Sequence, residues 1–317
     1  MMPSISIILN TYNSARFLLE TVDTVLNQTF QDFELIVIDD GSQDHSLALV
    51  SSVNDSRIKV FPYANAGIAA SRNRGLQHAT AEFVAFLDHD DLWHEKKLEN
   101  QWQALKARPS AAFAYSWLKT IDESGDFIRT YPPVRHSDNA YEKLLVKNFL
   151  HTASNPLIRR KELIEIGGFD EAIYGADDWD VFIRLATNSP IAVSPHHEIY
   201  YRIVKGSGSA NVDKIEQGCL QVVHKAFQAA PLKFQSIKPR TLGTIYQYLC
   251  FRTLEEMADR RSGFKSLHYW QKSYKNNSKL WGIVPTSKVF LKAILVMLFS
   301  PIVISYILSR INRNPQD

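Results

Sequence analysis

Cysteine is scarce in this chain: only Cys219 and Cys250 occur among 317 residues, and no Cys-x-x-Cys spacing is present. Two cysteines are too few for a disulfide framework or a cysteine-based zinc site, and they fit a reducing compartment. The first apolar run, Ile5–Leu9, begins almost at once and has the pattern of a strand. We therefore expect a cytoplasmic protein with no signal peptide or N-terminal anchor.

The formal net charge of +3 is small but unevenly distributed. Residues 1–232 carry 22 Lys and Arg against 29 Asp and Glu, whereas residues 233–317 carry 14 against 4. Such a basic region is typical of contact with nucleic acid or an anionic membrane, or of solvated helix faces. No recognised nucleic-acid-binding module is present, so we expect no nucleic-acid partner.

Residues 293–308 contain no charged side chain. Four cations flank this segment: Lys288, Lys292, Arg310 and Arg313. The segment is shorter than the ~20 residues that span a bilayer, and Pro301 would kink a helix. We expect a helix that lies in the anionic cytoplasmic leaflet, so that the protein is peripherally or monotopically attached there. A spanning helix over residues 289–308, a buried core helix and an oligomer contact are the alternatives.

Strand and helix patterns alternate up to about residue 115. Short apolar runs typical of buried strands occur at Ile5–Leu9, Phe33–Ile38, Ile58–Phe61 and Phe83–Leu87. Helical patterns occur between them, at Ala15–Asn27, Ser46–Val53 and Ile68–Gln77. This alternation predicts an α/β fold with a Rossmann-like, mostly parallel central sheet.

The pattern changes along the rest of the chain. Later strands are expected at Ile191–Val193 and Ile199–Ile203, after which only helical patterns follow. We therefore expect three regions: an α/β domain over residues 1–212, a helical accessory region over 213–287 and a membrane-associating tail over 288–317.

Polar residues follow three of the predicted strands, in residues 10–13, 39–42 and 88–91. In doubly wound sheets, ligands bind beyond the carboxyl ends of the strands. The acids of residues 88–91 suit Mg²⁺ or Mn²⁺ and a phosphate-bearing ligand, or else form a solvated turn. Asp39 and Asp40 are placed to accept hydrogen bonds from a nucleoside, or else form a plain turn with Gly41.

Two further segments have both a functional and a structural interpretation. Arg72 lies in a helix whose glycine-preceded start is suited to a phosphate group, or is simply a capped surface helix. Asp177 and Asp178 open another helix, where the helix dipole favours acids in any case. A carboxylate there is also placed to act as the general base of an inverting sugar transfer, with Trp179 stacking on a sugar.

Seven stretches together resemble the family 2 glycosyltransferases, which have the GT-A fold. They are SIILNTYN (6–13), TVLNQTFQDFELIVIDDGSQD (24–44), NAGIAASRNRGL (65–76), FVAFLDHDDLWHEKKLE (83–99), GGFDE (167–171), GADDWDVFIRL (175–185) and YYRI (200–203). Their order and spacing match the family over about 200 residues. The resemblance implies a GT-A domain followed by a C-terminal helical region.

The resemblance implies a donor site at the first two strand ends. Thr11, Tyr12 and Asp40 would hold the nucleoside, with Asp39 and Asn13 supporting them. The donor would be a nucleotide-diphosphate sugar, for which we expect a UDP-sugar.

The resemblance also implies the chemical roles of the later motifs. Arg72 would approach the diphosphate, and Asp88 and Asp90, the family's Asp-x-Asp, would bind Mn²⁺ or Mg²⁺, with Asp88 also on the donor. Asp178 would be the general base, with Asp177 and Trp179 on the acceptor side. Asp177 replaces the usual Glu, which leaves the proposed base in place.

We therefore expect an inverting, metal-dependent transfer of one sugar to a cell-surface glycan or lipid-linked acceptor. The Gln-x-x-Arg-Trp motif of the processive synthases is absent, which argues against polymer synthesis. The alternatives are a non-catalytic scaffold with this fold and a sugar nucleotidyltransferase, although the first turn lacks the glycine-rich loop of the latter. His89, His196 and His197 have no assigned role.

Overall fold

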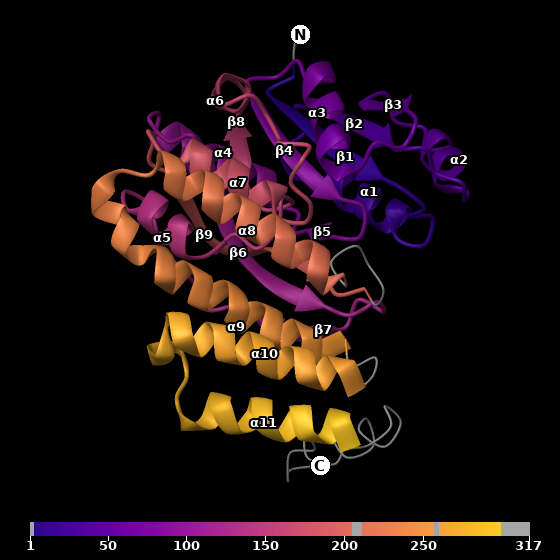
Figure 1. Cartoon of the computed structure of the whole chain (residues 1–317). Helices are drawn as coiled ribbons and strands as arrows, with labels where there is room; N and C mark the ends of the chain where they lie inside the picture. Colours follow the sequence, from indigo (N-terminus) through magenta and orange to yellow (C-terminus); the bar gives the residue numbers. More distant parts are fainter. Residues whose placement is uncertain (1–2, 205–210, 257–259, 299–317) are drawn as a thin grey trace, which may run out of the picture. The chain divides into compact units, whose positions relative to one another are not determined.

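The computed structural model describes residues 3–204, 211–256 and 260–298 (Figure 1). The chain divides into two compact units. The first comprises Met1–Leu144 and Asn148–Val204 and contains the sheet. The second comprises Leu145–Lys147 and Lys205–Asp317, and its described elements from residue 211 onward are helical.

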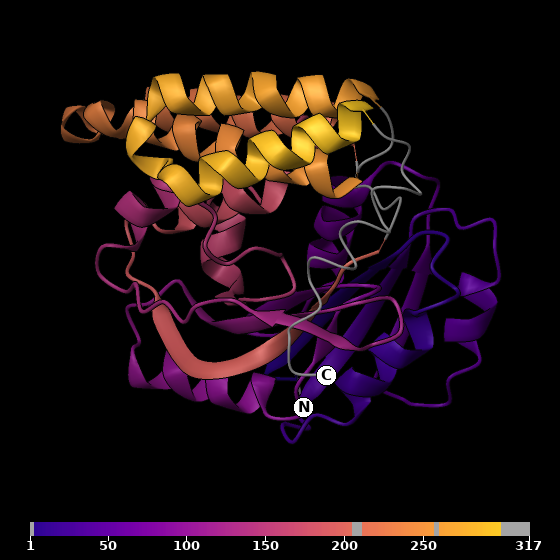
Figure 2. The same ribbon diagram turned by 90° about the horizontal axis from the view of Figure 1, so that it is seen from below.

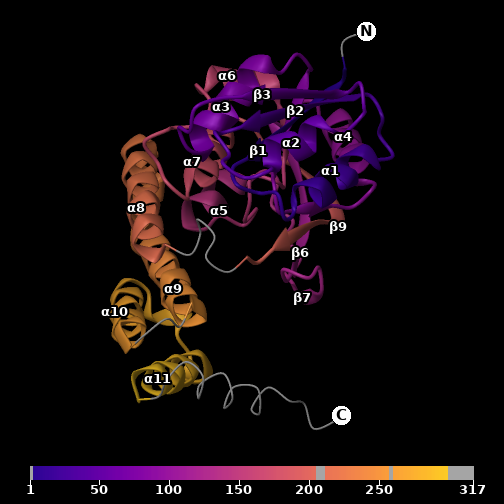
Figure 3. The same cartoon turned by 90° about the vertical axis from the view of Figure 1, so that its right-hand side faces the viewer.

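The first half of the sheet is parallel, in the order β3-β2-β1-β4. Its strands are β1 (Ile5–Thr11), β2 (Phe33–Asp39), β3 (Ile58–Pro62) and β4 (Phe83–Asp88). Helices α1 (Leu18–Leu26), α2 (Ser46–Ser51) and α3 (Ile68–His78) alternate with them, as the sequence predicts (Figures 1 and 3). Residues of β1, β2 and β4 are almost completely buried because helices cover the sheet, which explains their continuous apolar runs.

The two faces of β1 meet different helices. Ile7 and Leu9 belong to the core cluster that also contains Leu18 and Val22 of α1. On the alternate face, a Cβ atom built on Gly75 of α3 would lie 2.2 Å from Cγ2 of Ile8. Helix α3 therefore approaches the sheet more closely than any residue larger than glycine at position 75 would allow.

The second half of the sheet continues from β4 in the order β8-β6-β9-β5, with β7 paired to β6. Its strands are β5 (Leu92–Trp93), β6 (Phe113–Ile121), β7 (Phe127–Thr130), β8 (Leu157–Arg159) and β9 (Ala192–Arg202). The remaining helices of this unit are α4 (Lys97–Ala107), α5 (Ala140–Val146), which runs into residues of the second unit, α6 (Arg160–Glu165) and α7 (Asp177–Leu185). The sheet is thus mixed beyond β4, because β8, β7 and β5 pair antiparallel to their neighbours whereas β9 runs parallel to β6.

The prediction of two separate strands within residues 191–203 is wrong, because β9 is one long, curved strand (Figure 2). It runs parallel to β6 from Ala114 opposite Ala192 to Ile121 opposite Arg202. Register shifts on either side of Trp117 absorb the irregular segment around Pro195. The strand therefore continues where the sequence pattern is interrupted.

The second unit contains α8 (Val212–Ala229), α9 (Lys238–Glu256), α10 (Arg260–Asn276) and α11 (Ile283–Leu298). Short 3₁₀ helices, η2 (Leu232–Ile237) and η3 (Ser278–Leu280), connect them. Helix α10 packs against both α9 and α11 (Figures 2 and 3). Within the described ranges, none of the helices combines the length and apolar character needed to cross a bilayer. The part of the predicted tail from residue 299 onward lies outside the described residues.

Candidate active site

The carboxyl ends of β1, β2 and β4 bring the predicted polar clusters to one edge of the sheet. Thr11 is paired in register with Asp39, and Asn10 with Asp88. The backbone N–H of Asp40 continues this pattern by donating to the carbonyl of Thr11 over 2.9 Å. The prediction that these strand ends point to one place is therefore confirmed, and this edge is the candidate active site.

Asp40 is buried and holds the turn that leads into α3. Its two carboxylate oxygens accept hydrogen bonds from the backbone N–H groups of Ala66 (3.0 Å) and Gly67 (2.8 Å). Arg74 adds an ion pair at 3.0 Å. Gly67 has a φ angle of +92°, a backbone conformation that favours glycine. Asp40 therefore orders the loop beside the predicted nucleoside site, and its contact with the nucleoside stays a prediction.

The loop after β1 is tied to the loop after β2. Asn13 accepts a hydrogen bond from the backbone N–H of Gln43 at 2.7 Å, and its own N–H donates to the Ser42 hydroxyl at 3.0 Å. The Thr11 hydroxyl is hydrogen-bonded to that of Ser14. These contacts make Thr11 and Asn13 supports of the loop. Tyr12, by contrast, is 45% exposed and presents a ring on which a base could stack.

Buried polar atoms without a partner lie at the same strand ends. Neither side-chain atom of Asn10 has a hydrogen-bond partner among the described residues, and neither does Oδ1 of Asp39. The other Asp39 oxygen accepts from the N–H of Ser42 at 3.2 Å. Unsatisfied buried polar groups are rare because each costs about 1–3 kcal/mol. Such a pair at the edge of the sheet is expected where a ligand or water completes the site.

Arg72 of α3 joins β4 to α7. It is 3% exposed and forms ion pairs with Asp177 (2.5 Å) and Asp88 (2.8 Å). Burial disfavours its charge, but Asp88, Asp177 and Asp178 together raise the pKa of the guanidinium above its usual value. Both terminal nitrogens bind carboxylates, and the approach of Arg72 to a diphosphate stays a prediction. Arg72 therefore holds together the acids of two motifs that lie far apart in the sequence.

Asp178 differs from Asp177 although the two are adjacent. Burial and the neighbouring charge of Asp177 raise the pKa of Asp178 to about 7, while Arg72 acts in the opposite direction. One oxygen accepts from the backbone N–H of Trp179 at 2.6 Å, and the other lies 3.4 Å from Nδ2 of Asn148. A carboxylate with a pKa near neutrality is suited to take a proton at physiological pH.

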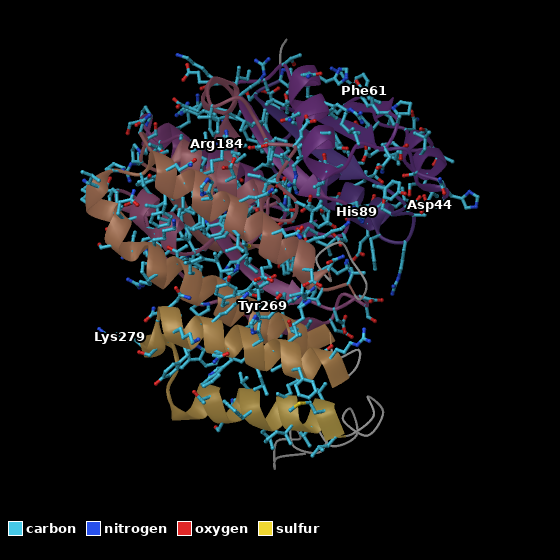
Figure 4. The ribbon with its side chains drawn as sticks, in the orientation of Figure 1. Asp44, Phe61, His89, Arg184, Tyr269 and Lys279 are labelled. Carbon is cyan, nitrogen blue, oxygen red and sulfur yellow. The ribbon has the colours of Figure 1, made fainter. Side chains whose placement is uncertain are left out.

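Helix α7 is fixed from both sides. The indole N–H of Trp179 donates to the carbonyl of Leu144 at 2.8 Å, and the ring is only 4% exposed. Arg184, labelled in Figure 4, forms an ion pair with Asp180 and donates to the carbonyl of Gly168. A buried indole with a bonded N–H offers no open face, so this arrangement disagrees with the prediction that Trp179 stacks on a sugar.

The acid-rich loop after β4 has its own anchors. Asp91 is fully buried, and its carboxylate accepts from the hydroxyl of Thr152 at 3.2 Å and from the N–H of Arg202 at 3.1 Å. The guanidinium of Arg202 donates to the carbonyl of Asp90 at 2.9 Å and pairs with Glu20 at 2.7 Å. Sequence reasoning did not assign Asn10, Asp91 or Arg202 to the site. Their one signal is their position within or beside the quoted motifs.

Asp88 and Asp90 were predicted to bind a metal ion. In the described ranges, no three His, Cys, Asp or Glu side chains gather so as to hold a metal on their own. Mg²⁺, however, is often held by one or two carboxylates together with substrate phosphates. Burial raises the pKa of Asp90; nearby His89 (Figure 4) opposes this, and Asp88 adds to it. These two carboxylates therefore fit a hard cation shared with a diphosphate, and the metal site stays a prediction.

Known proteins resemble this chain in sequence. An uncharacterized glycosyltransferase of Rickettsia felis is 29% identical over 225 residues, which cover 68% of this chain and 37% of that protein. The amylovoran biosynthesis glycosyltransferase AmsB of Erwinia amylovora is 32% identical over 192 residues, covering 57% and 63%. The matches to the first three curated relatives, all from Rickettsia, cover about a third of their length.

Solved structures share the fold. S. aureus TarS 1–349 in complex with UDP-GlcNAc has a TM-score of 0.63 at 17% identity, covering 86% of this chain and 89% of that one. The mannosyltransferase PcManGT of Pyrobaculum calidifontis, in complex with GDP-Man and Mn²⁺, has a TM-score of 0.60 at 20% identity, covering 98% and 86%. The fold is therefore that of the GT-A glycosyltransferases. The family described as "Glycosyltransferase like family 2" matches residues 4–253, so the chain belongs to that family.

Proposed function

We propose that the protein transfers a single sugar from a nucleotide-diphosphate sugar to a hydroxyl group of a glycan or lipid-linked acceptor, with inversion at the anomeric carbon. The observation that supports this most directly is Asp178, whose pKa is raised to about 7 beside the Arg72–Asp177 ion pair. In an inverting transfer, a carboxylate removes the proton of the acceptor hydroxyl as its oxygen attacks. Asp178 is the proposed base.

The donor would bind across the ends of β1, β2 and β4. Exposed Tyr12 would stack on the base, while the atoms of Asn10 and Asp39 that have no partner among the described residues would hydrogen-bond to the nucleoside. The nucleotide sugars bound by TarS and PcManGT support this class of donor, and we propose UDP as the carrier. Asp40 and Asn13 would keep the two surrounding loops in place.

Asp88 and Asp90 would hold Mn²⁺ or Mg²⁺, and PcManGT with its Mn²⁺ supports that choice. A divalent cation bound there would neutralise the charge that develops on the leaving diphosphate. Arg72 would keep the Asp88 carboxylate oriented through their 2.8 Å ion pair. It would also pair with Asp177, so that Asp178 is left to exchange the proton.

The acceptor is proposed to lie at the cytoplasmic face of the membrane, to which the protein would attach peripherally or monotopically through its C-terminal region. The excess of basic residues in 233–317 supports this placement, because anionic leaflets attract such segments. A lipid-linked or growing surface glycan would then present its hydroxyl group close to the enzyme.

The test is a transfer assay with a panel of UDP-, GDP-, dTDP- and CMP-sugars with and without Mn²⁺, together with the Asp178→Asn variant. We expect transfer from one nucleotide class, lost in this variant while donor binding, measured by thermal shift, is retained. Full activity of Asp178→Asn would exclude it as the base. A scaffold protein would show neither transfer nor a metal-dependent thermal shift with any nucleotide.

A further inference from the structure

Helix α11 has two apolar faces, although a helix at the surface of a protein normally has one. Its inner face, formed by Val289, Ala293 and Val296, is buried. It packs on α10 closely enough that a Cβ atom built on Gly263 would lie 2.9 Å from the carbonyl oxygen of Ala293. This face therefore already has its partner within the second unit.

The outer face of α11 is apolar and exposed. Leu291, Ile294 and Leu298 are 56%, 43% and 64% exposed, and their spacing of three and four residues aligns them along one side of the helix. We call these three residues the outer stripe. Exposed Lys288 lies one turn before Leu291 on the same side. Contiguous exposed apolar residues mark a surface that contacts something other than water.

The exposed side of α10 shows what an ordinary surface in this unit looks like. At helical spacing it presents Arg261, Phe264, His268, Gln271 and Lys275, so that one exposed apolar side chain, Phe264 (66%), stands among four polar or basic ones. The outer stripe is therefore a property of α11 and not of the whole helical unit.

Charge and length favour a membrane surface as the occupant. Residues 233–317 have a net charge of +10, which opposes the approach of a second copy of the same region but attracts anionic lipid. In sequence, the uncharged stretch of residues 293–308 is shorter than the ~20 residues that span a bilayer, so the segment would lie in the plane of the membrane. In sequence, the uncharged residues continue to Leu308, and basic Arg310 follows.

We propose that α11 docks the protein on an anionic lipid bilayer, with the outer stripe inserted at the boundary of headgroups and acyl chains. Lys288, and Lys292 near the stripe, would contact lipid phosphates. This inference rests on the proposed function, because docking would serve to bring the enzyme to an acceptor at the membrane.

The test is sedimentation of the full chain with vesicles of phosphatidylcholine alone or mixed with phosphatidylglycerol. We expect binding to the mixed vesicles only, reduced at least about tenfold by Leu291→Ser with Leu298→Ser. The matched control is Leu232→Ser with Tyr248→Ser, which also removes two exposed apolar side chains (90% and 50%) from this unit and should bind like the wild type. Because all four side chains are exposed, unchanged circular dichroism is expected.

Several outcomes would overturn the proposal. The proposal is refuted if the Leu291/Leu298 variant binds the mixed vesicles as strongly as the wild type. It is also refuted if the Leu232/Tyr248 control loses as much binding as that variant. If a chain truncated after Leu298 did not bind the vesicles, while the full-length Leu291/Leu298 variant still bound them, docking would be assigned to residues 299–317. A dimer in light scattering that this variant dissociates would assign the stripe to a second copy. Because vesicle binding is measured without a sugar donor, it does not depend on transfer activity. A protein that binds the vesicles but transfers no sugar would refute the proposed function and leave the docking proposal in place.

Discussion

The raised pKa of Asp178 makes the pH dependence of transfer a direct test of the proposed base. Burial and the charge of Asp177 raise it to about 7, against the opposing effect of Arg72. A general base works only when ionised, and the ionised fraction of a carboxyl group rises with pH. The rate at saturating donor and acceptor should therefore rise through neutrality and level off above it.

The expected change is large enough to measure. With a pKa of about 7, roughly 9% of Asp178 is ionised at pH 6 and roughly 91% at pH 8, so the rate should rise about tenfold. With the ordinary value of 3.8, the group would be ionised at both values and the rate would not change. The assay is the initial rate of sugar transfer between pH 5.5 and 8.5, with donor binding followed at each pH by thermal shift.

A pair of variants identifies the group that titrates. Asp177→Asn removes the charge that, after burial, contributes most to the rise, so the midpoint should move to lower pH. Asp180→Asn removes a carboxylate from the same helix, one that pairs with Arg184, and should leave the midpoint where it is. A flat profile between pH 6 and 8, or equal midpoints in the two variants, would refute the assignment of Asp178 as the base.

Three further predictions concern packing and support. Burial opposes ionisation of Glu34, but the Lys59 ammonium and nearby hydroxyls lower its pKa to about 2. Glu34→Gln should therefore lower the free energy of unfolding, measured with urea, by about 3 kcal/mol at pH 7. The difference from the wild type should disappear as the pH falls from about 4.5 towards 2. Gly75→Ala should lower the free energy of unfolding by about 1–3 kcal/mol because the added methyl group clashes with Ile8, and by less when Ile8 is also replaced by Ala. If the effects of the two substitutions were simply additive, the clash would not be the cause. Arg202→Met should raise the Mn²⁺ concentration for half-maximal transfer about 10–100-fold, and an unchanged requirement would exclude it as a support of the acid loop.

The first half of the fold could be predicted because its strands are buried on both faces. The apolar runs of β1, β2 and β4 are continuous, and each ends at a polar cluster that marks the edge of the sheet. The second half was less predictable. The two-residue strand β5 is too short to show a pattern, and β9 carries a proline and two histidines where it pairs irregularly with β6.

The acids of the candidate site could be found from the sequence, but their partners could not. Arg202 pairs with Glu20 across 182 positions, a contact that no local spacing reveals. The sequence also did not show that Trp179 points into the protein, because the first turn of an amphipathic helix has residues on both faces. Asn10 was seen within a polar run, but only the structure shows that its buried amide has no partner among the described residues.

One arginine explains how two neighbouring acids can serve different purposes. Like charges in a buried site do not ionise together without a cation, and Arg72 is paired with Asp177 and not with Asp178. Asp177 is thus held in an ion pair, while its charge and the burial of the site keep the pKa of Asp178 near neutrality. If Asp178 were paired in the same way, its pKa would fall and it would become a weaker base. The position of Arg72 between Asp88 and Asp177 thus connects the proposed donor end of the site to its proposed base.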